Sequence, residues 1–97
     1  MHQAGQETIL FVDDEESILD VASEFFKRRG YQVVTAGNGL EAVNILENQS
    51  VDCCFTDINM PGMNGIELLE IIRNHSPGTE CLMITVLDEA RVAVNCL

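Results

Sequence analysis

The fold is decided by residues 55–65, which read Phe-Thr-Asp-Ile-Asn-Met-Pro-Gly-Met-Asn-Gly. An apolar run that starts at Val51 leads into this stretch and ends at one carboxylate, Asp57. The proline and two glycines that follow are typical of a sharply turning loop. The pattern predicts a strand over residues 51–56 that delivers Asp57 to the edge of a sheet, and a loop that leads away from it.

Two other apolar runs also end in polar side chains. Residues 9–12 are followed by Asp13 and Asp14, and residues 82–84 are followed by Thr85. Continuous apolar character indicates strands that are buried on both faces, as in a parallel sheet. Ligands of open α/β sheets bind outside the carboxyl ends of the strands. If the three strands are neighbours, three carboxylates and one hydroxyl converge at one edge, which we expect to be the functional site.

The remaining sequence alternates between strand and helix patterns. Residues 1–6 read as a flexible, polar N-terminal lead-in, and residues 7–97 read as one domain. This alternation predicts an α/β fold with a parallel sheet and right-handed crossovers. We expect strands over 7–12, 31–36, 51–56 and 80–85, helices over 15–29, 40–47 and 66–75, and the start of a fourth helix over 88–96.

The net charge limits the partners that the chain can bind. Sixteen acidic residues against five basic ones give the 97 residues a formal charge of −11 at pH 7. This charge repels phosphate backbones and anionic lipids, so we expect no direct binding of nucleic acid or membrane. Cations and basic protein surfaces are the expected partners.

The localisation and the cysteines are interpreted together. The first residues are polar and no apolar stretch is long enough for a transmembrane helix, which favours a cytoplasmic protein. Cys53, Cys54 and Cys81 fall inside predicted buried strands, and no C-x-x-C motif occurs. We therefore expect the cysteines to be small core residues and not redox or zinc-binding groups.

Three carboxylates at one sheet edge predict a metal site. A divalent cation relieves their mutual repulsion, and oxygen ligands with few protein contacts suit Mg²⁺. The pair Asp13 and Asp14 can hold the ion, together with a backbone carbonyl near Asn59. Asp57 stands alone and can attack a phosphoryl donor, because aspartyl phosphates are established covalent intermediates. Thr85 can then donate its hydroxyl to the phosphoryl group, which provides a physical basis for a switch.

These motifs together resemble the receiver domain of two-component response regulators, the CheY-like superfamily. The resemblance rests on Val-Asp-Asp-Glu at 12–15, Thr-Asp at 56–57 followed by Met-Pro-Gly-Met-Asn-Gly at 60–65, and Ile-Thr at 84–85. It covers essentially residues 7–97. It implies a flavodoxin-like, doubly wound parallel sheet, here truncated after strand 4 and the start of helix 4. It also implies a phosphoprotein of phosphorelay signal transduction that is no enzyme beyond Mg²⁺-dependent self-phosphorylation and autodephosphorylation.

The resemblance implies a role for each residue at the predicted edge. Asp57 is implied to be the phosphoacceptor, which takes its phosphoryl group from a sensor histidine kinase or a phosphotransfer protein. The implied Mg²⁺ ligands are Asp14 and Asp57 directly, the backbone carbonyl of Asn59, and Asp13 through a water molecule. Thr85 is implied to be the switch hydroxyl.

Two alternatives are open. The family's fifth strand and helix have no counterpart in the sequence, nor has the lysine that contacts the phosphoryl group, since Lys27 is the only lysine. One alternative is therefore a truncated or pseudo-receiver interaction module that is not efficiently phosphorylated. The other is an aspartate-nucleophile phosphohydrolase, which turnover of a small phosphoester would reveal. The expected bare strand edge also favours a homodimer.

Overall fold

In the computed structural model, five strands form one sheet and three helices pack against it. The structure describes residues 6–87 and 90–95. For residues 85–87 and 90–95 it describes the backbone alone. In chain order the elements are β1 (Thr8–Val12), α1 (Glu16–Lys27), β2 (Gln32–Ala36), α2 (Gly39–Asn48), β3 (Cys53–Asp57), α3 (Gly65–His75), β4 (Glu80–Leu87) and β5 (Ala90–Asn95). The strand order is β2-β1-β3-β4-β5. The first four strands run parallel, so the α/β class and the flavodoxin-like order are confirmed.

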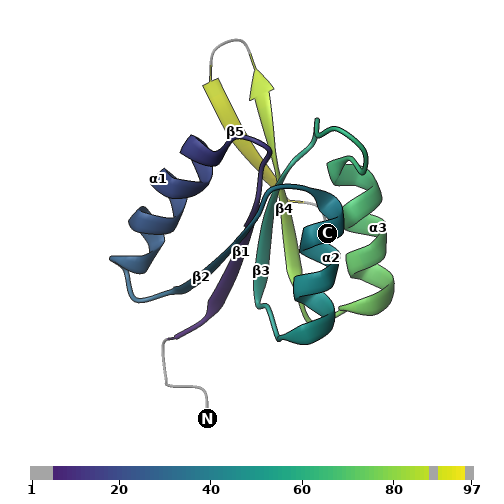
Figure 1. Cartoon of the computed structure of the whole chain (residues 1–97), viewed down its shortest axis with the longest axis horizontal. Coiled ribbons are helices and arrows are strands. Elements are labelled where there is room, and N and C mark those ends of the chain that lie inside the picture. The colour runs from purple at the N-terminus through teal and green to yellow at the C-terminus, as the bar shows by residue number, and fades with distance from the viewer. Residues whose placement is uncertain (1–5, 88–89, 96–97) are drawn as a thin grey trace.

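The helices cover the two faces of the sheet unequally. Helix α1 lies on one face, and α2 and α3 lie together on the other (Figure 1). Successive residues of a strand point to opposite faces. Leu10 accordingly packs with Leu68 and Ile72 on the side of α2 and α3, and all three side chains are buried.

Aromatic rings fill the space under α1. The rings of Phe11 and Phe55 stack with their centroids 4.8 Å apart, and Phe26 of α1 lies 5.4 Å from Phe11. Tyr31, at the amino end of β2, meets Phe26 edge to face with centroids 5.8 Å apart. Stacked and edge-to-face pairs of this kind add to the free energy of burial.

The end of the chain corrects one expectation. A fourth helix was expected over residues 88–96, but residues 90–95 form β5, which pairs antiparallel with β4. Only two residues separate the two strands, whereas a parallel crossover needs about a dozen. Val92 and Val94 favour extended structure, and a helix this short is marginal on its own. The β5 backbone also satisfies the edge of β4, which would otherwise carry unpaired amide and carbonyl groups.

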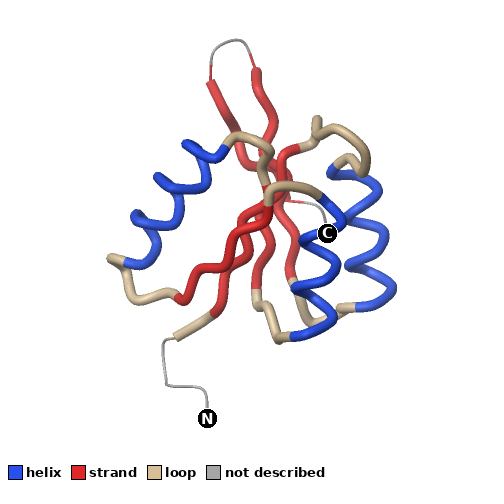
Figure 2. Tube along the Cα trace, in the orientation of Figure 1, coloured by secondary structure: helices blue, strands red, loops and turns tan. Residues whose placement is uncertain are grey.

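The lead-in expected over residues 1–6 lies, apart from Gln6, outside the described residues, as do residues 88–89 and 96–97. Figure 2 shows how the helical segments and the extended β4–β5 ribbon are distributed along the rest of the trace. Among the described residues, no helix has the length and the apolar character that crossing a bilayer requires.

Candidate functional site

Strand register brings the predicted site residues to one level of the sheet. Val12 of β1 pairs with Thr56 of β3, so Asp13 and Asp57 follow directly after paired neighbours. Asp57 itself pairs with Ile84 of β4. Thr85 therefore lies one residue farther along the next strand, inside β4, where its backbone pairs with Val92. Its side chain lies outside the described part of the structure.

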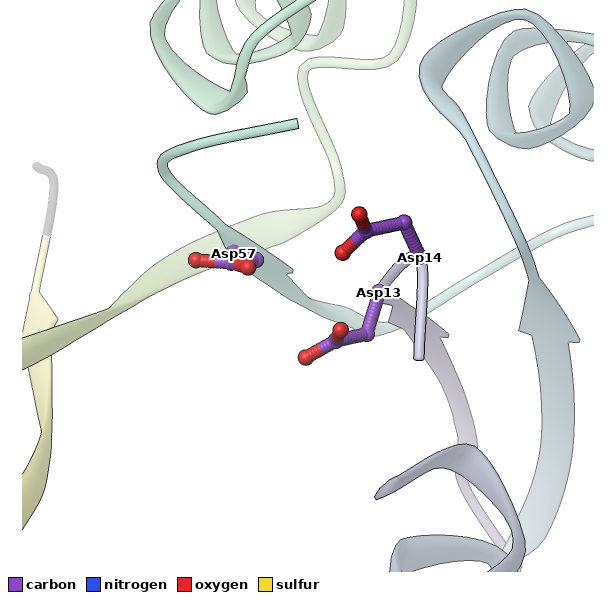
Figure 3. Close-up of side chains that lie close together, drawn as sticks. All are labelled: Asp13, Asp14 and Asp57. Carbon is purple, nitrogen blue, oxygen red and sulfur yellow. The ribbon is translucent and has the colours of Figure 1, made fainter. Parts of the chain in front are cut away.

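Three carboxyl groups converge at this level. One oxygen from each of Asp13, Asp14 and Asp57 lies within 4.8 Å of the other two. The side chains of Asp13 and Asp14 are both directed to the side on which Asp57 lies (Figure 3). Asp13 is 2% exposed and Asp57 9% exposed, whereas Asp14 is open to solvent. The predicted carboxylate cluster is thus present, with two buried members and one accessible member.

This cluster has the chemistry of a site for a hard divalent cation. At 4.8 Å and an effective dielectric constant of about 20, two carboxylates repel each other by on the order of 3 kcal/mol. A cation between Asp13 and Asp57 converts that repulsion into attraction. All the donor atoms are oxygens, and the exposed side of Asp14 leaves room for water and a phosphate, which is the coordination that Mg²⁺ prefers. The residues present therefore fit Mg²⁺.

Backbone amides fix two of the carboxylates in place. Glu15 donates its amide hydrogen to Asp13 Oδ1 at 3.0 Å, and Asn59 donates to Asp57 Oδ1 at 3.4 Å. Both contacts span two residues, so each carboxylate is oriented by the turn that follows its own strand. Asn59, which was predicted to contribute a backbone carbonyl, thus lies beside Asp57.

The loop after β3 is held close to Asp57 by Gly65, one of the two glycines that the sequence assigned to a tight loop. A Cβ atom on Gly65 would lie 2.5 Å from the carbonyl oxygen of Asp57. Gly65 is the first residue of α3, and its amide donates a hydrogen bond to the Ile58 carbonyl at 2.9 Å. Gly62 allows the turn, because its φ of 79° lies in the left-handed region. The sequence offered one signal for Gly65, its place at the end of the loop motif.

An acidic hollow of about 350 Å³ adjoins the cluster. Its walls include Asp13 and Asp14 and three further acids, Glu16, Asp20 and Glu41, none of which was predicted to belong to the site. Charges of one sign in a concave surface raise the local concentration of counter-ions. The hollow therefore favours cations on the side of β1 that faces α1 and β2.

Comparison with known proteins places this arrangement in a family. A family profile described as the response regulator receiver domain matches residues 9–97. Sporulation initiation phosphotransferase F of Bacillus subtilis is 35% identical over 83 residues, which make up 86% of this chain and 67% of that protein. A cyclic di-GMP phosphodiesterase of Thermotoga maritima is 31% identical over 90 residues, but the chain spans only 24% of its length. The chain likewise spans 38% of the probable transcriptional regulatory protein TcrX of Mycobacterium tuberculosis.

Solved structures agree with this result. The response regulator TrrA of Thermotoga maritima, determined in complex with Mg²⁺–BeF, matches with a TM-score of 0.79 and 33% identity. That match covers 84% of this chain and 71% of the other. A CheY-like receiver domain of Methanospirillum hungatei matches with a TM-score of 0.81 and 34% identity, covering 84% of this chain and 65% of the other.

Proposed function

The chain belongs to the response regulator receiver domain family, and we propose that its Asp57 accepts a phosphoryl group in a reaction that requires Mg²⁺. The observation that carries the proposal is the convergence of three carboxylates within 4.8 Å at the carboxyl ends of β1 and β3. Receiver domains are signalling domains that interact with histidine kinases or phosphotransfer proteins. The expected donor is therefore a phosphohistidine on such a partner.

Asp57 is the acceptor that the geometry favours. It ends β3, and its Oδ1 is oriented by the amide of Asn59. A carboxylate oxygen of Asp57 attacks phosphorus as the bond from phosphorus to the donor nitrogen breaks, and the bonding electrons leave with the imidazole. The product is an acyl phosphate, which water hydrolyses in a slower step. Positioning and charge neutralisation carry most of the catalysis in such transfers.

Asp14 and Asp57 would hold the metal directly, Asp13 would hold it through water, and the backbone carbonyl of Asn59 would complete the protein ligands. Bound Mg²⁺ supplies positive charge next to the transferred phosphoryl oxygens. Asp14 suits a direct role because it is exposed to solvent.

Thr85 is the proposed switch residue. Its backbone lies one residue beyond the level of Asp57 on the neighbouring strand, at the edge of the sheet where the phosphoryl group would form. A hydroxyl that hydrogen-bonds only the phosphorylated state biases β4 toward a second arrangement. Thr85→Ala should retain phosphoryl incorporation and lose the accompanying change in amide hydrogen exchange along β4.

The test is intact mass before and after incubation with acetyl phosphate and Mg²⁺. We expect one phosphoryl adduct on the wild type, none with Asp57→Asn, and none when EDTA replaces Mg²⁺. Asp52→Asn is the matched control. It makes the same chemical change at the residue that precedes β3, whereas Asp57 is the last residue of that strand. An adduct that persists in Asp57→Asn would overturn the assignment.

Two further measurements separate the alternatives. Mg²⁺-dependent binding of beryllofluoride without an adduct from acetyl phosphate would favour the pseudo-receiver alternative, in which the site forms but transfer is inefficient. Steady turnover of p-nitrophenyl phosphate that depends on Asp57 would favour a phosphohydrolase. We expect beryllofluoride binding, one adduct and no steady turnover.

Self-association is part of the proposal. Helix α1 alone covers its face of the sheet, where Phe55 is only half-buried, and β5 forms one edge of the described sheet. Strand edges and partly covered apolar faces favour pairing between copies. Light scattering during gel filtration should give a mass that rises with concentration, and a concentration-independent monomer would contradict this part.

A further inference from the structure

Two cysteines from distant parts of the sequence lie side by side in the sheet. Cys54 of β3 and Cys81 of β4 are paired residues in adjacent parallel strands. Both side chains belong to the core under α2 and α3, with exposed fractions of 0% and 5%. Their thiols share a hydrogen bond. Directly paired positions on adjacent strands fall within the range of Cα separations that a disulfide spans.

The two sulfurs differ in their access to solvent. Cys81 lines an open groove of about 460 Å³ between α3 and β4, and Cys54 is not part of its wall. The groove is lined by Leu69, Ile72, Arg73, Pro77, Thr79, Glu80 and Cys81. A small, uncharged oxidant can therefore reach Cys81 from the groove, while Cys54 lies behind it in the core.

The surroundings of Cys81 also favour its thiolate. The hydrogen bond from Cys54, followed by the positive charge of Arg73, lowers the pKa of Cys81 below its ordinary value, against the opposing effect of burial. The same hydrogen bond and burial raise the pKa of Cys54. A thiolate in an accessible, electropositive position is the reactive form of cysteine.

We propose that Cys81 and Cys54 form a hydroperoxide-reactive pair that closes to a disulfide between β3 and β4. The Cys81 thiolate attacks one oxygen of the hydroperoxide, the O–O bond breaks, and Cys81 becomes a sulfenic acid while the other oxygen leaves as hydroxide or alkoxide. The Cys54 sulfur then attacks the Cys81 sulfur and releases water. Two thiols are oxidised to one disulfide, and the peroxide is reduced by two electrons.

Cys53 provides a control within the same chain. It precedes Cys54, so its side chain faces the opposite side of the sheet, in a hollow that also contains Glu7, Asp52 and Glu80. Burial, and then the charge of Glu80, raise the pKa of Cys53 from 9.0 to about 11. The pKa shifts of Cys53 and Cys81 thus have opposite directions, so the thiolate is disfavoured at Cys53 and favoured at Cys81. The greater nucleophilicity of the more basic sulfur offsets part of the resulting difference in rate, so we expect Cys81 to react faster than Cys53 by a modest factor.

The test uses the reduced Cys96→Ser protein, otherwise unchanged, with a slight excess of hydrogen peroxide at pH 7. We expect the mass to fall by two hydrogen atoms, and peptide mapping to find Cys54 linked to Cys81. Cys53→Ala should leave both results unchanged. Cys54→Ala should prevent the bridge, and, because it also removes the hydrogen bond from Cys54, it should leave a sulfenic acid on Cys81 that forms more slowly and that dimedone traps. Asp57→Asn should form the bridge at the wild-type rate, so this test is independent of phosphoryl transfer.

The outcomes that overturn the proposal need no variant that could fail to fold. Two free thiols at Cys54 and Cys81 after peroxide treatment of the wild type would overturn it, as would oxidation of Cys53 before Cys81. A pH profile of alkylation gives a second measurement on the unmodified chain. The rate at Cys81 should level off at lower pH than the rate at Cys53, and the reverse order would overturn the proposed order of attack.

Discussion

Residues 8–75 and the β4–β5 ribbon reach the same sheet by different means. In the first region each strand is followed by a helix that crosses back over the sheet, so neighbouring strands run parallel and the loops after β1 and β3 gather at one edge. In the ribbon, two residues connect β4 to β5, and the chain returns antiparallel along the outer edge of β4. The first region supplies all three carboxylates, and the ribbon supplies Thr85.

The difference shows which features depend on local sequence. Side-chain caps fix the starts of α2 and α3: Asn38 accepts the Glu41 amide at 2.8 Å, and Asn64 and Glu67 form a reciprocal capping box at the start of α3. The two residues of each cap lie within four positions of one another in the sequence, so the local sequence is enough to predict the cap. The conformation of residues 90–95 depends instead on β4, which lies across a turn, so a non-local partner decides it.

The largest expected effect comes from comparing one proposed site residue of the first region, Asp14, with the one of the ribbon, Thr85. Asp14→Asn should slow phosphoryl incorporation from acetyl phosphate by about a thousandfold, because it removes a charged ligand from the proposed metal site. Thr85→Ala should slow incorporation by no more than about tenfold, the effect of one hydrogen bond. Time courses of intact mass give both rates. Asp20→Asn, which lines the same acidic hollow, is the control and should stay close to wild type.

The next effect tests the core of the crossover region. Leu10→Ala removes a fully buried side chain from the centre of β1 and should lower the free energy of unfolding by about 3 kcal/mol. Urea denaturation followed by circular dichroism measures the change. Leu40→Ala is the matched control, since Leu40 is 75% exposed in α2 and its loss should change stability by less than about 0.5 kcal/mol. Equal effects at the two positions would contradict the burial that separates them.

A smaller effect tests the contact that holds the loop against β3. Gly65→Ala places a methyl group 2.5 Å from the Asp57 carbonyl oxygen, so the loop has to move, at a cost of roughly 2 kcal/mol. Gly78→Ala has open space at its Cβ position and should be neutral or slightly stabilising. The same denaturation experiment compares the two. Mg²⁺ affinity should fall only in Gly65→Ala, and unchanged affinity there would show that the loop moves without disturbing the site.

The smallest effect belongs to the ribbon. Val92→Pro removes an amide from the strand that pairs with β4 and should lower the free energy of unfolding by about 1 kcal/mol, because an edge strand tolerates proline better than a central one. Hydrogen exchange should quicken in β4 and β5 and stay unchanged in β1. A loss as large as that of Leu10→Ala would mean that the ribbon and the crossover region unfold as one unit.

The sequence predicted the first region well because its signals are local. Apolar runs that end in Asp13, Asp14 and Asp57 located the strand ends, and the parallel register then brought those residues together as expected. The helix expected over residues 88–96 was wrong for 90–95, because pairing with β4 outweighs a weak local preference. The roles of Asn59 and Thr85 in the site stay predictions.

The paired cysteines show what a linear reading does not reveal. Cys54 and Cys81 are 27 positions apart, and neither belongs to a spacing motif. Their placement in the core was predicted correctly. That they face each other follows only from the register of β3 against β4, which no feature within a few residues of either cysteine determines.

The packing of Tyr31 against Phe26 gives the protein an intrinsic optical reporter. The chain has one tyrosine and no tryptophan, so emission excited at wavelengths that phenylalanine does not absorb comes from a single ring. That ring lies at the amino end of β2, under α1, while the carboxylates lie at the opposite ends of the strands. Emission should therefore follow the detachment of α1 without any label. The emission should not change when a ligand binds at the carboxylates on the opposite edge of the sheet. Fluorescence titrations at Asp57 therefore need an introduced chromophore.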